Sequence, residues 1–299
     1  MFVYILSYDV AIENTSNIGK ELMGVSGKLA NVGISTSCFY PMETELALEN
    51  GARLGISDFE VHFSTFSELH SGYLKELNKL LKHYGARVHS VHPFYSMLES
   101  AMFFSEYNER RFADGVEIYK QFFHATARIG AKYLVFHGGT TIGKSRCKVS
   151  DDEYIERYHY LCECGKKFGV TLLHENVYTH KAESVEFCCK LIDYLGDKAL
   201  FTFDNKQARR AGYVSAEFAR ALSGHIRNIH ISDCNAEHDC LLPGRGTEDF
   251  VAIRSAMSGE DEDALWAIEV YDDAFRDPDE LRQSANYLKS VLNRPTANE

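Results

Sequence analysis

The feature that most constrains this chain is a regular alternation between short apolar runs and longer amphipathic segments. Eight apolar runs of strand length follow one another, each bounded by Gly or polar residues. Several are nearly continuous hydrophobic stretches, as is typical of parallel strands that are buried on both faces. They cover residues 31–37, 58–63, 87–92, 132–137, 170–175, 199–204, 226–231 and 265–271.

The segments between these runs have the spacing of amphipathic helices. Residues 67–85 place leucines on one face and lysines opposite, and residues 106–130 form a similar face with Phe, Tyr and Val side chains. A glycine stands where several of these helices would end, as expected at a helix C-terminus. These glycines are Gly55, Gly85, Gly130 and Gly169.

Strand–helix alternation implies parallel strands joined by right-handed crossovers, and eight rounds favour a closed barrel over an open sheet. The sequence therefore predicts an α/β protein with one (β/α)8 TIM-barrel domain. A chain of 299 residues is long for one domain, but such barrels often reach this length. We assign residues 29–299 to the barrel and residues 1–28, which have no place in the repeat, to an N-terminal extension.

Composition and motifs exclude several classes of protein. The net charge is −11, so nucleic acid, which requires clustered Lys and Arg, is not an expected partner. No apolar run approaches the ~20 residues of a membrane span, and the apolar start lacks the basic region of a signal peptide. The eight cysteines include no CxxC pair, and we expect reduced thiols in a cytoplasmic protein. No GxGxxG or GxxxxGK[ST] motif supports a dinucleotide or P-loop site.

Ionisable side chains stand at or near the ends of the third to the eighth run. In order they are His92, His137, Glu175, Asp204, His230 and Glu269. The C-terminal ends of the strands of a TIM barrel form the mouth of its active site, so these side chains should converge there. A buried carboxylate is costly unless something compensates its charge, and a divalent cation does so directly. The last four residues make a mostly oxygen-donor set, which suits Mn²⁺, Mg²⁺ or Co²⁺ better than a structural zinc.

The strand ends and the loops after them carry short motifs that can be compared with known families. They are SVHPF at 90–94, LVFHGG at 134–139, LLHEN at 172–176, FTFD at 201–204, IHISD at 229–233, LPGRGTEDF at 242–250 and AIEV at 267–270. In these motifs the chain resembles the sugar-phosphate isomerase/epimerase group of xylose-isomerase-like TIM barrels, which includes ketose 3-epimerases and is related to endonuclease IV. The resemblance covers residues 30–292.

The resemblance implies a set of metal ligands and pocket residues. The implied ligands of one divalent ion are Glu175, Asp204, His230 and Glu269. Mn²⁺ is the expected metal, and Mg²⁺, Co²⁺ or Zn²⁺ could take its place. The resemblance places His92 and His137 in the lining of the substrate pocket. It also allows a homo-oligomer, because relatives are often dimers or tetramers.

The implied activity is a metal-dependent isomerase that acts on a sugar or sugar phosphate. Epimerising a carbon next to a ketone removes a proton of very high pKa, and a divalent ion stabilises the enediolate that forms. Glu175 and Glu269 are the candidate acid/base pair, which would take the proton on one face and return it on the other. Aldose–ketose isomerisation would use the same groups, and so would an inosose-type dehydratase that does not return the proton.

Two departures from the family pattern bear on the number of metal ions and on phosphodiester hydrolysis. Gln207, itself a candidate for substrate contact, stands where relatives usually have a histidine three residues after the sixth-strand aspartate. Cys240 stands where relatives with several metals have another histidine. A trinuclear phosphodiesterase of the endonuclease IV type would lack these ligands, which argues for one metal. A sugar-binding barrel without catalysis stays open, although a pure binder needs no acid/base pair.

Five further residues are weaker candidates for substrate contact. Glu60 and His62 share one face of the second run by the period of two along a strand, and both fit a supporting role equally well. Asp233 and His238 follow the seventh run, where they could contact the substrate. Arg245, in a glycine-flanked turn, could meet a phosphate or an anionic sugar.

The same period predicts which histidines are structural. His89 and His174 fall on the strand face opposite to that of the candidate site residues. We expect both to pack against helices outside the barrel interior.

Overall fold

Each of the eight predicted apolar runs contains a β-strand in the computed structural model, which describes residues 29–94, 99, 102, 108–141 and 149–294. The strands are β1 (Asn31–Ser35), β2 (Asp58–His62), β3 (Arg87–His92), β4 (Tyr133–Phe136), β5 (Thr171–Glu175), β6 (Phe201–Asp204), β7 (Ile226–Ile231) and β8 (Leu265–Ile268). All eight lie within the predicted limits. The predicted extension 1–28 and the first residues of the helix predicted over 106–130 lie outside the described residues.

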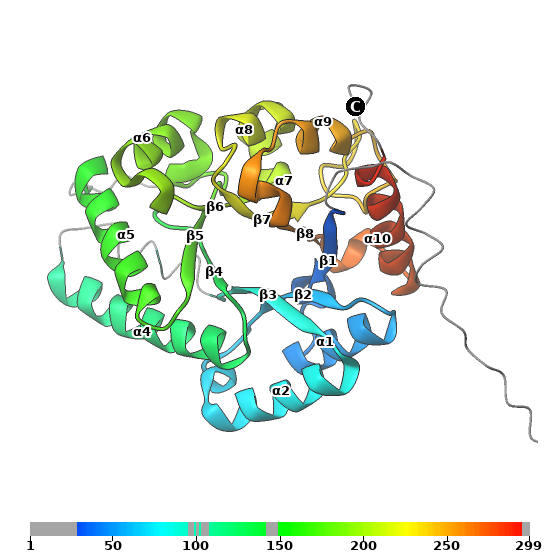
Figure 1. Cartoon of the computed structure of the whole chain (residues 1–299), viewed down its shortest axis with the longest axis horizontal. Helices are drawn as coiled ribbons and strands as arrows, with labels where there is room; N and C mark the ends of the chain where they lie inside the picture. The colour runs from blue at the N-terminus through cyan, green and yellow to red at the C-terminus, as the bar shows by residue number, and fades with distance from the viewer. Residues whose placement is uncertain (1–28, 95–98, 100–101, 103–107, 142–148, 295–299) are drawn as a thin grey trace, which may run out of the picture.

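The strands pair in parallel in chain order, and β8 pairs with β1, so the sheet closes into a barrel (Figure 1). Helices surround this barrel on the outside. They are α1 (Thr44–Arg53), α2 (Ser71–Tyr84), α4 (Glu109–Arg128), α5 (Asp151–Lys166), α6 (Val185–Leu195), α7 (Asn205–Arg210), α8 (Ser215–Ala221), α9 (Phe250–Ser255) and α10 (Asp279–Leu292). The predicted single-domain TIM barrel is confirmed.

The helices begin and end at the signals expected from the sequence. α2 is followed by Gly85 with a φ of 64°, the left-handed conformation that glycine adopts without strain. The segment predicted as one helix over 67–85 divides into a 3₁₀ turn (Phe66–Leu69) and α2. The reason is a capping box, in which Thr65 and Glu68 bond to each other's backbone and start the turn. Asn108 caps α4 by accepting a hydrogen bond from Arg111 N.

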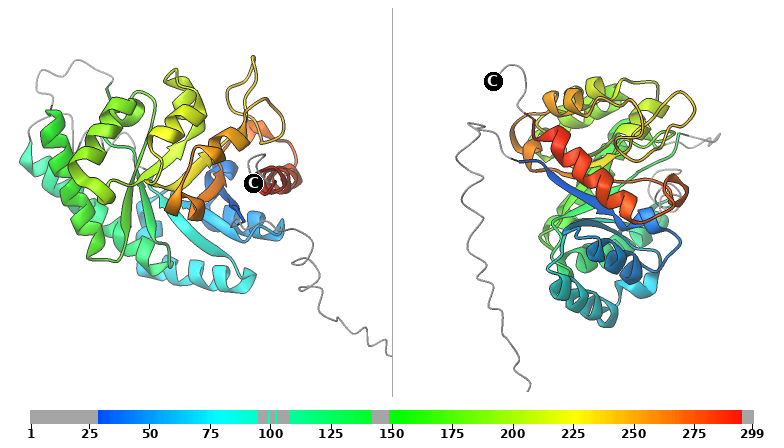
Figure 2. Two further views of the ribbon diagram at one scale, coloured as in Figure 1. Left: turned by 45° about the horizontal axis from the view of Figure 1, so that its top comes forward. Right: turned by 90° about the vertical axis from the view of Figure 1, so that its right-hand side faces the viewer.

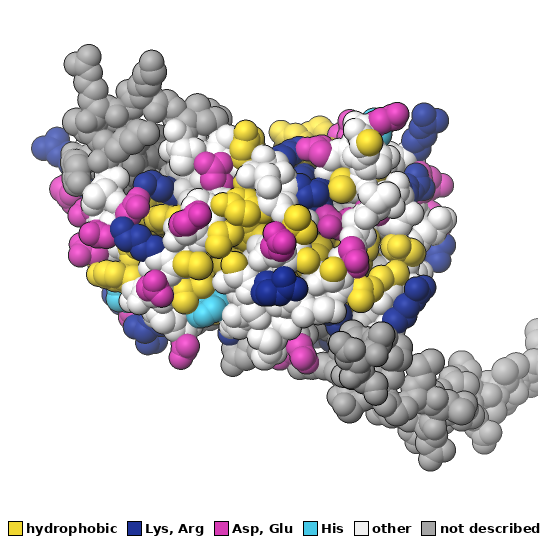
Figure 3. All heavy atoms as spheres, turned by 90° about the horizontal axis from the view of Figure 1, so that it is seen from above, with side chains coloured by type: hydrophobic (Ala, Val, Ile, Leu, Met, Phe, Trp, Pro, Cys, Tyr) yellow, Lys and Arg dark blue, Asp and Glu magenta, His cyan; other side chains and the backbone are white. Residues whose placement is uncertain are grey.

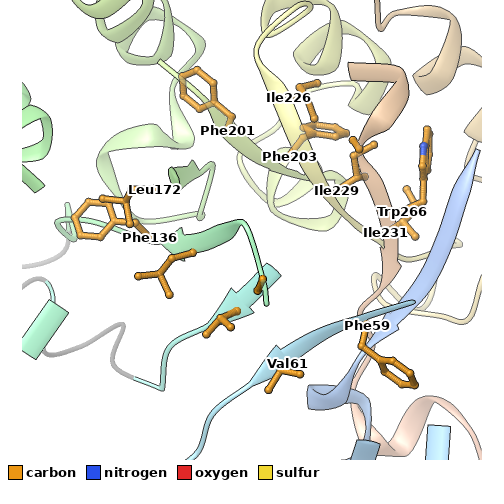
Figure 4. Close-up of a cluster of buried hydrophobic side chains, with 14 of the residues drawn as sticks. Phe59, Val61, Phe136, Leu172, Phe201, Phe203, Ile226, Ile229, Ile231 and Trp266 are labelled. Carbon is orange, nitrogen blue, oxygen red and sulfur yellow. The ribbon is translucent and has the colours of Figure 1, made fainter. Parts of the chain in front are cut away.

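Outward-facing side chains of the strands form the hydrophobic layer between barrel and helices. Figure 4 shows part of this layer. Its labelled side chains, all buried, are Phe59, Val61, Phe136, Leu172, Phe201, Phe203, Ile226, Ile229, Ile231 and Trp266. Burial of a large apolar side chain contributes roughly 1.5–3 kcal/mol, so this layer holds the helices on the barrel. The barrel interior therefore does not have to be apolar, and it carries Glu60, Ser90 and Asn228, which hydrogen-bond to one another across it.

Two one-residue bulges change which side chains face inward. The register between β2 and β3 shifts after Phe59, and that between β6 and β7 shifts after Phe201, which leaves His89 and Arg227 as the extra residues. His89 Nε2 lies 2.8 Å from the carbonyl oxygen of Arg227, four strands away. The prediction that His89 packs against helices is wrong, because the period of two does not continue through a bulge. His174 does pack on the helix side, against aromatic rings of α5, as predicted.

The last helix closes the ring beside the first strand. α10 lies alongside β1 in Figure 2, and Asn293 Oδ1, just after α10, accepts a hydrogen bond from Ala30 N at 2.9 Å. Ala30 directly precedes β1. The two ends of the barrel domain therefore support each other.

The outer surface carries mixed charges. On the face seen from above, basic and acidic side chains alternate with hydrophobic ones (Figure 3). Among the helices described, none combines the length and the apolar character needed to cross a membrane. The seven cysteines within the described residues are all free thiols.

The close approach of β1 and β2 at Gly33 can be tested by substitution. A Cβ at Gly33 would lie 2.0 Å from the backbone carbonyl oxygen of Asp58, whereas a Cβ at the exposed Gly72 of α2 would meet nothing within 4 Å. We expect Gly33→Ala to lower the free energy of unfolding by about 3 kcal/mol, because the strand pair must separate. Gly72→Ala should leave stability unchanged or raise it by less than about 1 kcal/mol. Urea denaturation followed by circular dichroism measures both, and equal stability of the two variants would contradict the strand spacing.

Candidate metal centre

The ionisable side chains predicted to converge are gathered at the C-terminal mouth of the barrel. They stand at, or within one residue of, the ends of six neighbouring strands, β3 to β8. In strand order they are His92, His137, Glu175, Asp204, His230 and Glu269. Because all the strands run in parallel, their C-terminal ends share one side of the barrel.

Three carboxylates surround one ring nitrogen of His230. Its Nδ1 lies 3.4 Å from Glu175 Oε1, 3.4 Å from Glu269 Oε2 and 3.9 Å from Asp204 Oδ2. Donor atoms of Glu175, Asp204 and His230 all lie within 4.8 Å of one another, and each of these residues is at most 2% exposed. The four predicted metal ligands therefore surround one buried point.

His230 and Asp204 each have one polar atom that contacts another protein group and one that has no hydrogen-bond partner. His230 Nε2 lies 2.9 Å from Glu60 Oε1, while His230 Nδ1 makes no well-aligned hydrogen bond. Asp204 Oδ1 caps α7 by accepting from Gln207 N at 2.9 Å, while Oδ2 has no hydrogen-bond partner. An unpaired buried polar atom costs about 1–3 kcal/mol and is rare. A divalent cation would satisfy both open atoms, and this mostly oxygen-donor set fits such an ion.

Glu60 lies beneath this centre and does not line the cavity. Its fully buried carboxylate accepts hydrogen bonds from Ser90 Oγ and Asn228 Nδ2, each at 2.8 Å. Burial alone would raise the pKa of Glu60, but the imidazole of His230 lowers it to about 2. The sequence pattern allowed a substrate contact or a supporting role for Glu60. Its position is that of a residue that orients His230.

The crowded carboxylates alter the proton affinities of the centre. Burial, together with the charges of Glu269 and Glu175, raises the pKa of Asp204 to about 6 in spite of the nearby Lys206. Burial would lower the pKa of His230, but the surrounding carboxylates raise it well above its usual range. Protons and a metal ion would therefore compete for this cluster, and binding of a divalent ion would release protons.

A cavity of about 450 Å³ opens above the centre, a size usual for small-molecule sites. Glu175 and Glu269 reach it, whereas Asp204 and His230 are not among its lining residues. The rest of the lining is Ser37, Tyr40, His62, His92, His137, Val177, His180, Lys206, Gln207, Val270 and Tyr271. The carboxylates that reach the cavity are the two predicted to act as acid and base.

A second, larger cavity of about 750 Å³ lies at the opposite end of the barrel. Its lining includes the first residues of five strands, namely Asn31, Asp58, Arg87, Tyr133 and Leu265. Within the described part of the chain, the groups of residues that could hold a metal all lie at the other end. The chemistry of a TIM barrel is expected at the C-terminal ends of the strands, so the smaller cavity is the candidate site.

Three histidines stand in a row on the cavity wall. The ring centres of His62 and His92 are 5.1 Å apart, and those of His92 and His137 are 4.6 Å apart. His92 Nδ1 lies 2.9 Å from the carbonyl oxygen of Pro93 and must carry a proton, so in the neutral ring Nε2 accepts from His137 Nε2 at 2.8 Å. Burial would lower the pKa of His137, but Glu175, 3.0 Å away, raises it to about 9. Burial lowers the pKa of His62 to about 3. At neutral pH the wall therefore places a cationic His137 beside Glu175.

Lys206 was not among the residues predicted from the sequence, yet it lines the cavity from the first turn of α7. Its ammonium lies 3.6 Å from Glu269 Oε2 and 3.9 Å from Asp204 Oδ2. Burial would lower the pKa of Lys206, but the two carboxylates raise it above its usual range. A charged residue two positions after a strand-end aspartate was the signal that could have identified it.

His180 was also missed, and it reaches the cavity from the loop that follows β5. The preceding residue, Thr179, has a φ of 68°, which a β-branched side chain rarely adopts. Backbone strain of this kind concentrates at functional sites, so this loop belongs to the site. No sequence pattern marks Thr179 or His180.

Besides Glu60, three of the predicted substrate contacts do not reach the cavity. Asp233 is buried, and its carboxylate accepts hydrogen bonds from the backbone N–H groups of residues 234, 244, 246 and 248, so it organises the loop after β7. His238 is exposed in that loop. Arg245 forms an ion pair with Glu280 on α10. Gln207 does line the cavity, and its Oε1 accepts from Tyr178 N at 3.1 Å.

Comparison with known proteins identifies the family. Residues 48–291 match the xylose isomerase-like TIM barrel family, and the chain belongs to that family. An uncharacterised protein of Mycobacterium leprae is 22% identical over 293 residues, which covers 88% of this chain and 98% of the relative.

Two solved structures illustrate the fold. A D-psicose 3-epimerase, crystallised in the presence of D-fructose, superposes with a TM-score of 0.73 at 15% identity and covers 88% of this chain and 100% of its own. The IOLI protein, crystallised with a zinc atom, superposes with a TM-score of 0.67 at 16% identity and covers 88% of this chain and 98% of its own. At such identities the likeness establishes the shared fold. The buried His and Glu groups in this fold form a candidate divalent-metal site.

Glu60→Gln tests whether the buried pair beneath the centre tunes metal binding. The amide cannot stabilise His230 as the carboxylate does, so we expect metal affinity to fall about 10–100-fold. Asp261→Asn is the control, because Asp261 is equally buried but binds Gly224 N and Ile226 N at the start of β7. Isothermal titration with Mn²⁺ measures both. Unchanged affinity in Glu60→Gln, or an equal loss in the control, would contradict this role of Glu60.

Proposed function

We propose that this protein is a metal-dependent isomerase, an epimerase or aldose–ketose isomerase of a sugar or sugar phosphate. The observation that carries the proposal is the pair of carboxylates Glu175 and Glu269. Both reach the cavity, and each lies 3.4 Å from the same nitrogen of His230. A substrate carbon held above that point would have a carboxylate within reach from each of two separate strands.

The charge states of this pair suit proton transfer. Burial would raise the pKa of Glu175 and Glu269, but His230 and the other nearby cations lower both, so both are carboxylates at neutral pH. An ionised carboxylate can accept the proton of a carbon acid on one face, and the other glutamate, once it has taken up a proton from solvent, can donate it to the opposite face. His137, beside Glu175, stabilises that carboxylate in the form that accepts a proton.

The metal would contribute what these side chains cannot. A divalent cation held by Glu175, Asp204, His230 and Glu269 would polarise the carbonyl group and so acidify the neighbouring carbon. The three carboxylates and one imidazole favour Mn²⁺, and Mg²⁺, Co²⁺ or Zn²⁺ could take its place. The protein holds these ligands in fixed positions. Glu60 orients His230, and Asp204 is fixed as the N-cap of α7, so neither side chain needs to rearrange during the reaction.

Metal content tests the centre directly. We expect about one equivalent of a divalent metal in the purified wild-type protein, reduced in Glu175→Gln and Asp204→Asn because each removes a charged ligand. Glu248→Gln is the control, since this largely buried carboxylate pairs with Arg209 and lies outside the cavity lining. Elemental analysis by mass spectrometry makes the measurement. A wild-type protein that stays free of metal after reconstitution would refute the proposed centre.

Exchange of carbon-bound hydrogen tests the acid/base pair. In D₂O the wild-type protein should exchange the proton at the carbon next to the carbonyl of its ketose substrate, found by screening ketoses with and without phosphate. Glu175→Gln and Glu269→Gln should each slow epimerisation about 100-fold or more, the magnitude of lost general acid–base catalysis. If the two carboxylates serve opposite faces, each variant should retain exchange from one epimer only. NMR follows the exchange, and normal turnover by either variant with full metal content would contradict the assignment.

A further inference from the structure

Lys206 is a buried cation at the edge of the candidate site for which the proposed function has so far supplied no role. Its side chain is 5% exposed, and it lines the cavity together with Glu269 and Tyr271. It comes from the first turn of α7, two residues after Asp204. Burying an ammonium group is expensive unless it is fully paired, so its position calls for an explanation.

The groups around Lys206 fix the position of its ammonium but do not accept hydrogen bonds from it. Glu269 Oε2 and Asp204 Oδ2 lie at 3.6 Å and 3.9 Å, beyond hydrogen-bond distance, and the ammonium stands over the ring of Tyr271, 4.9 Å from its centre. An ammonium that served only as a counter-ion would close to about 2.7–2.9 Å of one carboxylate. Within the described residues no hydrogen bond to its three donors is found. At least one donor is therefore available to an oxygen atom in the cavity.

The proposed reaction creates such an oxygen next to Glu269. When a carboxylate removes the proton from the carbon beside a ketone, the C–H electron pair becomes a carbon–carbon double bond. The electrons of the carbonyl bond move to its oxygen, and the proton stays on the carboxylate. Negative charge thus develops on a substrate oxygen while the neighbouring glutamate becomes neutral, so the attraction of Lys206 shifts from Glu269 toward the substrate.

We propose that Lys206 donates a hydrogen bond to the substrate oxygen on which this negative charge develops, and that it is a catalytic residue of the site. The proposal rests on the proposed function. It implies a substrate with a carbonyl group next to the carbon that loses its proton, as in a ketose. A donor fixed in advance and shielded from water is effective because it need not reorganise as charge develops.

Lys206→Met tests the proposal, because methionine has a similar length and no charge. The probes are a sugar hydroxamate, whose planar anion resembles an enediolate, and the neutral polyol of the same length. We expect Lys206→Met to weaken hydroxamate binding by about 100-fold, in line with the loss of one donor to a developing oxyanion. Polyol affinity and metal content should stay close to those of the wild type. Lys206→Arg should retain part of the hydroxamate affinity, because it keeps the charge with a different shape.

The controls separate this role from simpler ones. Lys190→Met removes a lysine that pairs with Asp152 on the surface and should change neither probe, and thermal unfolding should show that all variants fold. Loss of metal in Lys206→Met, or an equal loss of hydroxamate and polyol affinity, would overturn the proposal and make Lys206 a structural counter-ion. Wild-type affinity for the hydroxamate in a folded Lys206→Met would also overturn it, and would leave the proposed function intact. A wild-type protein that binds neither probe would overturn the proposed function and, with it, this role of Lys206.

Discussion

The centre depends on one buried ion pair, Glu60 with His230, in the middle of the barrel. A carboxylate at this depth is tolerated only because His230, Ser90 and Asn228 all donate to it. The pair fixes the ring of His230, which makes Nε2 the atom that faces Glu60 and Nδ1 the atom that faces the three carboxylates above. The hydrophobic layer between strands and helices carries the stability of the fold, so the barrel interior can hold this polar column.

The charged residues around His230 explain why the site suits a cation. Three carboxylates, those of Glu175, Asp204 and Glu269, are crowded at the end of the barrel above that of Glu60, and the nearby cations are His137, His230 and Lys206. Burial and this crowding raise the pKa of Asp204, and the carboxylates raise the pKa of His137 and His230. These three groups therefore hold protons more tightly than they would in water. A divalent ion would replace those protons. The arrangement thus couples metal affinity to pH in the direction of stronger binding at higher pH.

Much of this could be predicted from the sequence, and the failures have physical causes. Strand positions and the converging residues, including Glu175 and Asp204, follow from apolar runs that end in a charge, because parallel strands must share one end. The face of His89 could not be predicted, because a bulge inserts a residue that hydrophobic periodicity does not mark. The sequence predicts Asp233 as a substrate contact, but it binds four backbone N–H groups, and a strand-end carboxylate looks the same in the sequence in either role. Lys206 lies just outside the strand pattern, on a helix whose first turn points into the cavity.

At Gln207, and in the loop that contains Cys240, where the chain departs from the family pattern, the described side chains make other contacts. Gln207 Oε1 accepts from Tyr178 N and so ties α7 to the loop after β5, in which His180 reaches the cavity. His238 is exposed on a loop organised by Asp233, and Asp239 pairs with Arg210. Atoms already engaged in this way, or turned to solvent, are poorly placed to complete a cluster of several metals. Lys206 beside Glu269 and Asp204, and His137 beside Glu175, already place positive charge next to the centre, in agreement with the single ion of the proposed function.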